Sequence, residues 1–382
     1  MCAPFWTAAS PMRSDPRVVA VTGAAGFIGR NLVVRLEELG HEVRPVTRAQ
    51  SAQEAEAALM AADVVFHLAG AVRPPDPEDF VRTSAFASIC AEAIAKGARR
   101  PLVVCSSSRR AGDDTAYGRS KRACEGALLQ LAARGEATVV VYRLPNVFGK
   151  WARPNYNSAV ATFCHNLGRG LPIRVDDPAA PLSLLYVDDL LEQWAALVRE
   201  PPAESGYRDV AEVHETTVGQ VAALLSAFAD GRRSGQVENV GSGLERALYA
   251  TFVAGLPAEA FSYPLVAHTD PRGSFAEVLK TRGGGQVSVL TAEPGMTRGG
   301  HYHHSKVEKF LVVHGQARFR FRHILSGETY ELTTSGGAPV VVETIPGWTH
   351  DITNVGEGVM VSVLWASEIF DRARPDTVLM PV

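Results

Sequence analysis

The N-terminal part of the chain alternates between short apolar runs and longer amphipathic stretches. An apolar run at Val18–Thr22 predicts a strand, and the next segment has apolar residues at the spacing of a helix that buries one face. A second strand is predicted at Glu42–Val46, and buried runs follow at 64–72 and 102–108, each ending in small or polar residues. Such runs are typical of a parallel sheet. The pattern predicts a doubly wound parallel α/β sheet.

The C-terminal third has a different pattern, in which short apolar strands are separated by glycines and histidines. Residues 308–313 predict one strand, and residues 345–354 predict another that returns antiparallel beside an earlier one. This part of the chain predicts an all-β domain.

The length of the chain fits two domains. Its 382 residues exceed one typical domain, and each part is large enough to bury its own core. A polar, glycine-rich stretch at 230–243 marks the change of pattern. We assign an N-terminal extension, expected to be disordered, at 1–16, a first domain at 17–245, a connecting segment at 246–263 and a second domain at 264–382.

Three glycines lie between the first predicted strand and its helix. They let the backbone turn tightly and approach a pyrophosphate at the positive end of the helix. The order of strand, glycines, helix and second strand makes the pattern specific. It predicts a dinucleotide site of the Rossmann type. The residues expected to contact the cofactor are Gly23, Gly26, Phe27, Ile28, Gly29, Leu68, Ala69 and Lys121.

The end of the second predicted strand distinguishes the two nicotinamide cofactors. An NAD enzyme normally has an acidic residue there, against the ribose hydroxyls. This chain has Arg48 instead, and an arginine fits a ribose phosphate. The sequence therefore predicts NADPH rather than NADH. The alternative is an exposed arginine in a loop.

Tyr117 and Lys121 are one helical turn apart, so they share a helix face. A tyrosine with a reference pKa of about 10 transfers protons poorly at neutral pH. A nearby lysine cation favours the phenolate and lowers that pKa, which suits a general acid or base. The pair predicts a proton-transfer site.

This arrangement resembles the extended short-chain dehydrogenase/reductase family, in which a serine at the end of the preceding strand assists the tyrosine. The resemblance implies Ser108 in that role, with Ser107 as the alternative. The segment from residue 143 onward resembles the substrate-binding half of nucleotide-sugar reductases. That resemblance implies that Asn146, Arg153 and Asn155 hold sugar or phosphate oxygens.

Four potential metal ligands occur in the C-terminal part. Successive side chains of a strand alternate between its faces, so His301 and His303 project together. Glu308 follows after a turn, and His350 lies on the strand that returns beside the first. Three imidazoles and one carboxylate suit zinc, iron, manganese or nickel, with positions left open for water or substrate. We favour zinc. The alternative is a histidine-rich surface loop.

The spacing from Gly295 through these ligands to Gly315, followed by Gly347, His350 and Asn354, resembles the two cupin motifs. It departs from them at Pro346, which directly precedes Gly347, whereas the motif usually keeps a residue between the two. This departure affects the expected turn more than the ligand His350. The resemblance implies a metal-binding cupin barrel and a homodimer built through it.

Almost the whole chain resembles the bifunctional capsular polysaccharide and O-antigen enzymes of the capsular polysaccharide synthesis enzyme F type. In that family the cupin epimerises a UDP-4-keto-6-deoxy-N-acetylhexosamine next to the ketone, with C3 favoured. The reductase then reduces C4 with NADPH, giving UDP-N-acetyl-6-deoxy-L-talosamine. The resemblance implies the same two steps here. Tyr302 replaces an expected tryptophan between the histidines, which could affect substrate fit.

Carbon-acid chemistry orders these steps independently. A ring C–H is acidic only beside a carbonyl, so epimerisation must precede reduction. Candidate acids or bases near the metal are Tyr302, His304, Lys306 and Asp351, and the sequence favours none of them. Two alternatives remain. One is a reductase of another nucleotide 4-ketosugar, and the other is a non-catalytic cupin that binds sugar or dimerises.

Charge and cysteine content exclude several classes of protein. A formal net charge of −3 gives no general attraction to nucleic acid or anionic membrane. The five cysteines lie in the first part without paired spacing, so we expect a reducing cytoplasm and no disulfide framework. No segment has the length of a membrane span, and the first sixteen residues lack the apolar core of a signal peptide.

Overall fold

The structure is a computed structural model that describes residues 16–382 except 283, 339, 372 and 374. The predicted N-terminal extension therefore lies outside the described residues apart from Pro16. Contacts divide the chain into two compact units. The first comprises residues up to Leu225 together with Ala247–Leu256, and the second comprises Ser226–Arg246 together with Pro257–Val382.

The first unit is built on a six-stranded sheet in the order β2-β1-β3-β4-β5-β8, with every neighbouring pair parallel. Its strands are β1 Val18–Thr22, β2 Glu42–Val46, β3 Val64–His67, β4 Leu102–Ser108, β5 Thr138–Leu144 and β8 Gly206–Arg208. The inner strands are buried because helices cover both faces of the sheet. The doubly wound sheet predicted from the sequence is confirmed.

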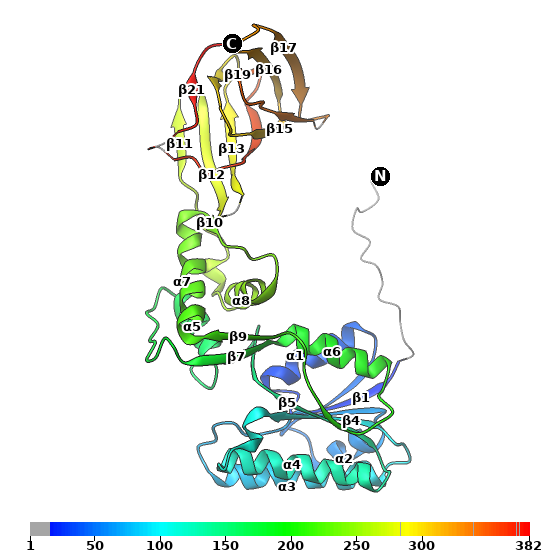
Figure 1. Ribbon diagram of the computed structural model, residues 1–382. Coiled ribbons are helices and arrows are strands. Elements are labelled where there is room, and N and C mark those ends of the chain that lie inside the picture. Colours follow the sequence, from blue (N-terminus) through cyan, green and yellow to red (C-terminus); the bar gives the residue numbers. More distant parts are fainter. Residues whose placement is uncertain (1–15, 283, 339, 372, 374) are drawn as a thin grey trace. The chain divides into compact units, whose positions relative to one another are not determined.

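Figure 1 shows α1 and α6 on one face of this sheet and α2, α3 and α4 on the other. The bounds of these helices are α1 Phe27–Glu38, α2 Ala52–Met60, α3 Glu78–Lys96, α4 Ala116–Ala133 and α6 Val187–Arg199. From β1 the chain passes to β2 on one side and then to β3 on the other. This reversal opens a crevice at the carboxyl ends of β1 and β3, where ligands bind in such sheets.

A smaller sheet and further helices follow along the chain, up to the region where it passes between the two units. The small sheet has the order β6-β7-β9. The remaining bounds are β6 Asn146–Phe148, α5 Ala159–Leu167, β7 Pro181–Tyr186, β9 Val213–Thr217, α7 Val218–Ser234, α8 Gly243–Ala254 and the 3-10 turns Arg109–Gly112 and Ala258–Ala260. The predicted connecting segment 246–263 thus contains most of α8 and the second 3-10 turn. The exact domain boundaries stay a prediction.

The second unit contains two β-sheets. One has the order β10-β12-β13-β20-β15-β18, with β11 paired to β12, and the other has the order β17-β16-β19-β14-β21. Their strands are β10 Gln236–Val237, β11 Ala267–Asp270, β12 Gly273–Thr281, β13 Gly285–Ala292, β14 Thr297–Tyr302, β15 Glu308–His314, β16 Gln316–His323, β17 Thr329–Ser335, β18 Val341–Glu343, β19 Trp348–Asn354, β20 Met360–Ala366 and β21 Val378–Leu379.

Both sheets of the second unit contribute to one apolar core. Leu290, Phe310 and Leu364 come from the first sheet, and Phe319 and Ile352 come from the second. The described strands do not form a single closed barrel, because no strand of one sheet pairs with a strand of the other. The all-β prediction is confirmed, but barrel closure is not observed.

Candidate functional site

The glycine turn after β1 leaves no room for side chains. Gly23 has φ 70°, and its N–H donates to the Val46 carbonyl at 3.1 Å. A Cβ added to Gly23 would lie 2.8 Å from the backbone nitrogen of Ala69, and one added to Gly29 would lie 2.3 Å from the Gly23 carbonyl oxygen. The turn therefore requires glycine at both positions, and it places α1 directly behind the crevice.

The hydroxyl of Thr22 joins the two strands that border this crevice. It accepts hydrogen bonds from the backbone nitrogens of Leu68 and Ala69 at 3.2 and 3.3 Å. Phe27 and Ile28 occupy the first turn of α1. The predicted cofactor contacts in and next to β1, α1 and β3 therefore lie around one turn. Lys121 is the exception, because it lies on another helix.

Arg48 is exposed in the turn that follows β2, a position that fits both a contact with a cofactor phosphate and the alternative of an exposed loop arginine. A second cation, Arg30, lines a shallow groove beside the same turn together with Pro45, Thr47 and Trp151. Its guanidinium donates to the Trp151 carbonyl at 2.9 Å. The sequence analysis did not select Arg30, because its position on α1 gives no local sign that it faces this groove.

Helix α4 carries the tyrosine and lysine on one face. The helix is capped by Thr115, whose hydroxyl accepts from the Gly118 nitrogen at 3.0 Å. The Lys121 ammonium lies 5.9 Å from the centre of the Tyr117 ring. Lys121 is buried, and its ammonium donates to the Ser106 carbonyl at 3.3 Å. The lysine is therefore held at the end of β4, beside the tyrosine.

The two candidate serines differ in their partners. Ser107 is buried, and its hydroxyl donates to Glu125 at 2.5 Å. Ser108, the last residue of β4, accepts from the Arg110 nitrogen at 3.2 Å. Neighbouring residues of a strand face opposite sides of the sheet. The Ser107 side chain therefore faces α4, and the Ser108 side chain faces the other side. Ser107 is thus committed to a structural hydrogen bond.

Glu125, which is buried, is the centre of a hydrogen-bond network that the sequence analysis missed. Its carboxylate pairs with Arg143 at 2.9 and 2.6 Å and accepts from the Tyr207 hydroxyl at 2.9 Å. Burial alone would raise the pKa of Glu125, but hydrogen bonds from Arg143, Ser107 and Tyr207 lower it. The network ties α4 to β4, β5 and β8, so it fixes the helix that carries Tyr117.

The three residues predicted to bind substrate lie near the start of the small sheet. Asn146 begins β6 and is exposed, and Arg153 and Asn155 are exposed in the loop after it. The Arg153 guanidinium lies 5.2 Å from the centre of the Tyr156 ring. Asn155 has φ 54°, and its N–H donates to the Thr162 hydroxyl at 3.0 Å. The loop is thus ordered by local contacts.

The structure brings the four predicted metal ligands together. One ligand atom from each of His301, His303, Glu308 and His350 lies within 4.8 Å of the others. His301 stands opposite His350 in the pairing of β14 with β19, and Glu308 begins β15 in the other sheet. The Glu308 carboxylate lies 3.3 Å from the Nε2 atom of His303 and 3.6 Å from that of His350.

The ionisation states of this cluster suit metal binding. Burial, followed by the charges of His350 and His303, lowers the pKa of His301 to about 4. Burial alone would raise the pKa of Glu308, but hydrogen bonds from His303 and His350 hold it well below its ordinary value. A neutral imidazole and an ionised carboxylate are the forms that coordinate metals. The donor set therefore fits a divalent metal such as zinc.

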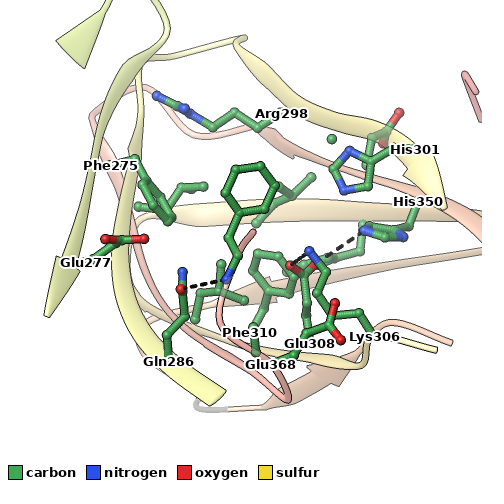
Figure 2. Close-up of a pocket in the computed structure, with 18 of the residues that line it drawn as sticks. Phe275, Glu277, Gln286, Arg298, His301, Lys306, Glu308, Phe310, His350 and Glu368 are labelled. Carbon is green, nitrogen blue, oxygen red and sulfur yellow. Dashed lines mark hydrogen bonds and ion pairs between the residues drawn. The ribbon is translucent and has the colours of Figure 1, made fainter. Parts of the chain in front are cut away.

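A pocket of about 370 Å³ adjoins the cluster. Figure 2 shows His301, His350, Glu308 and Lys306 at one end, Phe275 and Glu277 at the other, and the Arg298 side chain reaching along the pocket between them. Apolar and polar residues share the rest of the lining, among them Leu290, Phe310, Phe319, Ile352 and Leu364 together with Arg272, Gln286, Asp351 and Glu368. Such a pocket can bind a ring-sized ligand beside a metal.

A β-bulge between Gly299 and His301 shapes this pocket. It inserts an extra residue into β14, so Arg298 and His301 both line the pocket despite their odd spacing. The Nε atom and one terminal nitrogen of Arg298 are buried without a hydrogen-bond partner in the described chain. Asp270 lies 3.8 Å away, but its carboxylate already binds Arg272 at 2.6 Å. Arg298 can therefore hydrogen-bond a ligand.

The four candidate acids or bases form two pairs, one lining the pocket and one outside it. Lys306 and Asp351 line the pocket, whereas Tyr302 and His304 do not and contact each other, with ring centres 5.3 Å apart. The Lys306 ammonium lies 3.2 Å from the Glu308 carboxylate. Asp351 is paired with Arg320 through a bond of 3.1 Å and a second, shorter one. Lys306 and Asp351 remain the candidates for proton transfer.

Comparisons with known proteins agree with this two-part organisation. Residues 19–210 match the NAD dependent epimerase/dehydratase family, and residues 268–378 match the polysaccharide biosynthesis C-terminal domain. A UDP-2-acetamido-2,6-beta-L-arabino-hexul-4-ose reductase of Pseudomonas aeruginosa is 48% identical over 361 residues, covering 94% of this chain and 97% of the relative.

Solved structures extend the comparison. The capsular polysaccharide assembling protein CapF of Staphylococcus aureus is 38% identical, with a TM-score of 0.87 over 95% of this chain and 99% of that one. RMD of Pseudomonas aeruginosa, solved with NADPH, has a TM-score of 0.51 and 18% identity over 63% of this chain and 97% of its own, so it shows a shared fold alone.

In the part of the chain that the structure describes, none of the helices is long and apolar enough to cross a membrane. The segment matched by the first family model contains the glycine turn and the Tyr117 and Lys121 pair, and the segment matched by the second contains the histidine cluster. The chain therefore belongs to the NAD dependent epimerase/dehydratase family, in a form that carries the polysaccharide biosynthesis C-terminal domain.

Proposed function

We propose that this chain is a bifunctional nucleotide-sugar enzyme. Its C-terminal unit, a metal-dependent cupin, epimerises a UDP-4-keto-6-deoxy-N-acetylhexosamine beside the ketone, with C3 favoured. Its N-terminal unit then reduces C4 with NADPH to a UDP-N-acetyl-6-deoxy-L-talosamine-like product. One observation carries the proposal: two candidate sites occur on one chain. The first is the Tyr117 and Lys121 pair near a dinucleotide turn, and the second is a set of four metal-donor residues beside a pocket. The name of the Pseudomonas relative supports a 4-ulose substrate.

The reductive step needs a hydride and a proton. NADPH, when bound along the turn from Gly23 to Gly29, supplies the hydride to C4. Tyr117 donates its phenolic proton to the ketone oxygen as the C–O π bond breaks, and the product is an alcohol. Lys121 stabilises the phenolate that remains. Ser108 hydrogen-bonds the ketone oxygen and so orients it towards Tyr117.

Cofactor choice rests on the cations near the adenosine end of the turn. Arg48 is exposed after β2, where a ribose phosphate would lie. Arg30 provides a second positive charge beside the same turn. Arg30 is the charged side chain among the residues that line the groove, and Arg48 follows in the next turn, so both charges favour the additional phosphate of NADPH over the bare ribose of NADH.

The epimerisation removes a proton from the carbon beside the ketone and returns one to the opposite face. A divalent metal held in this site would supply Lewis-acid chemistry beside the sugar ketone. His301, His303, Glu308 and His350 would hold it. Lys306 and Asp351, which line the pocket, would carry the proton, while Arg298 would bind an anionic group of the substrate at the far end. A homodimer through this unit remains part of the proposal.

Steady-state reduction tests the oxidoreductase part. The full chain is mixed with the 4-ketosugar, and NADPH oxidation is followed by its absorbance. Tyr117→Phe removes the proton donor, so we expect about a 10²- to 10⁴-fold loss of kcat with the fold intact. Arg119→Gln, an exposed change on the same helix, is the control. Full activity of Tyr117→Phe would exclude the proposed proton donor.

A second function is favoured by the way the histidine cluster bridges both sheets of the C-terminal unit. His301 and His350 belong to one sheet and Glu308 to the other. A metal at this point would cross-link them and stabilise the unit without chemistry. In that case removing the metal would lower stability, and proton exchange at the sugar would not depend on it.

A further inference from the structure

The last residues of the chain pack against the loop that carries the metal ligands. Strand β21 pairs with β14, where Leu379 stands opposite His301 and Val378 opposite Tyr302. The Met380 nitrogen donates to the Gly300 carbonyl at 2.9 Å. We name residues 375–382 the C-terminal strap. The strap holds the strand on which His301 lies.

Asp376 of the strap binds the next part of that loop with its side chain. One carboxylate oxygen accepts from the His304 nitrogen at 2.8 Å. The other accepts from the Ser305 and Lys306 nitrogens at 2.7 and 2.8 Å and from the Ser305 hydroxyl at 2.9 Å. Successive backbone N–H groups that converge on one anion form a rigid concavity. The carboxylate thus fixes the turn between His303 and Glu308.

The backbone of Asp376 contacts a metal ligand directly. Its carbonyl oxygen lies 2.5 Å from the Nδ1 atom of His303. A carbonyl oxygen only accepts hydrogen bonds, so Nδ1 carries the proton. The Nε2 atom of His303 then keeps its lone pair, and it faces Glu308 at 3.3 Å. This is the tautomer and orientation that a metal ligand requires.

We infer that Asp376 is a positioning residue for the metal site, which sets the geometry of His303 and of the turn leading to Glu308. The inference rests on the proposed metal site. It adds that the affinity for metal depends on the Asp376 carboxylate, which does not coordinate the metal and lies more than seventy residues from His303 in sequence. Groups that orient metal ligands typically change metal affinity by 10- to 100-fold when they are lost.

The test compares the full-length protein with Asp376→Ala, Asp376→Asn and Glu357→Ala. The last variant removes an exposed carboxylate of the same unit and is the control. Zinc dissociation constants are measured against a chromophoric chelator. The visible spectrum of the cobalt form reports the ligand geometry, and circular dichroism of the metal-free proteins reports their folding.

We expect about a 10- to 100-fold weaker zinc affinity and an altered cobalt spectrum for Asp376→Ala, a smaller loss for Asp376→Asn, and no change for Glu357→Ala. If Asp376→Ala does not fold, Asp376→Asn, which keeps one acceptor oxygen, decides the comparison. Unchanged affinity and spectrum in the folded variants would overturn the inference and leave the metal site intact. Absence of zinc binding by the unmodified protein would instead overturn the proposed metal site.

Discussion

The hydroxyl of Ser107 donates a 2.5 Å hydrogen bond to the carboxylate of Glu125, and both groups are buried. This contact separates the two candidate serines, because a hydroxyl committed to a structural carboxylate is poorly placed to hydrogen-bond a ketone. Ser108→Ala should therefore lower kcat for NADPH-dependent reduction by about 10²-fold with little effect on stability. Ser107→Ala should lower the free energy of unfolding by about 1 kcal/mol and retain most activity. Chemical denaturation and steady-state kinetics on both variants check this, and the reverse pattern would assign the role to Ser107.

Glu125 should make the stability of the protein depend on pH. Its hydrogen bonds hold the pKa below the ordinary value of 4.5, so the folded state favours the ionised form. The stabilisation is present above the ordinary pKa and is lost as the pH falls through the lowered one. We expect the melting temperature of Glu125→Gln to lie below that of the unmodified protein at pH 7, with the gap narrowing below about pH 4.5. A gap that stays constant down to pH 3 would contradict this account.

Arg48 should determine cofactor preference. Replacing it with alanine removes a charged partner of the ribose phosphate, worth about 1.5 to 3 kcal/mol, so KM for NADPH should rise about 10- to 100-fold while KM for NADH changes little. Arg44→Ala is a matched control, because Arg44 lies on β2, just before the turn that carries Arg48, and is already paired with Glu42 at 2.7 Å. Equal effects of Arg48→Ala on both cofactors would argue against phosphate recognition.

Arg298 should bind the substrate in the metal pocket. Two of its nitrogens are buried without a hydrogen-bond partner in the described residues, so a ligand oxygen there would gain charged hydrogen bonds. Arg298→Met should raise the sugar concentration needed for half-maximal proton exchange by about 10-fold or more. Lys309→Met, which removes an exposed cation paired with Glu343, should leave it unchanged. Identical exchange kinetics in the two variants would exclude Arg298 from the binding site.

Local sequence patterns predicted the parts of both sites that depend on short-range geometry. Gly23 must be glycine because of its φ and the nearby Ala69, and Tyr117 and Lys121 share a helix face because they are four residues apart. His301 and His350 were predicted to meet on adjacent strands, and they stand opposite each other.

Other features depend on contacts that no local pattern encodes. Asp376 meets the metal loop from seventy residues away, Glu125 meets Arg143 and Tyr207 across the sheet, and Arg298 lines the pocket only because of a bulge. The expected barrel is not observed, because spacing along the chain predicts strands but not which strands pair, and the described strands of this unit form two separate sheets.

Proton NMR of the full-length protein in deuterated water tests the central claim most directly. The protein is incubated with a UDP-4-keto-6-deoxy-N-acetylhexosamine, first without NADPH and then with it. The account predicts that a ring proton beside the ketone exchanges before any cofactor is added. A chelator and His301→Ala should abolish that exchange, whereas a Tyr117→Phe variant should exchange normally and fail to reduce. Clean reduction on adding NADPH, with no earlier exchange, would contradict the account and leave a reductase whose metal site is structural.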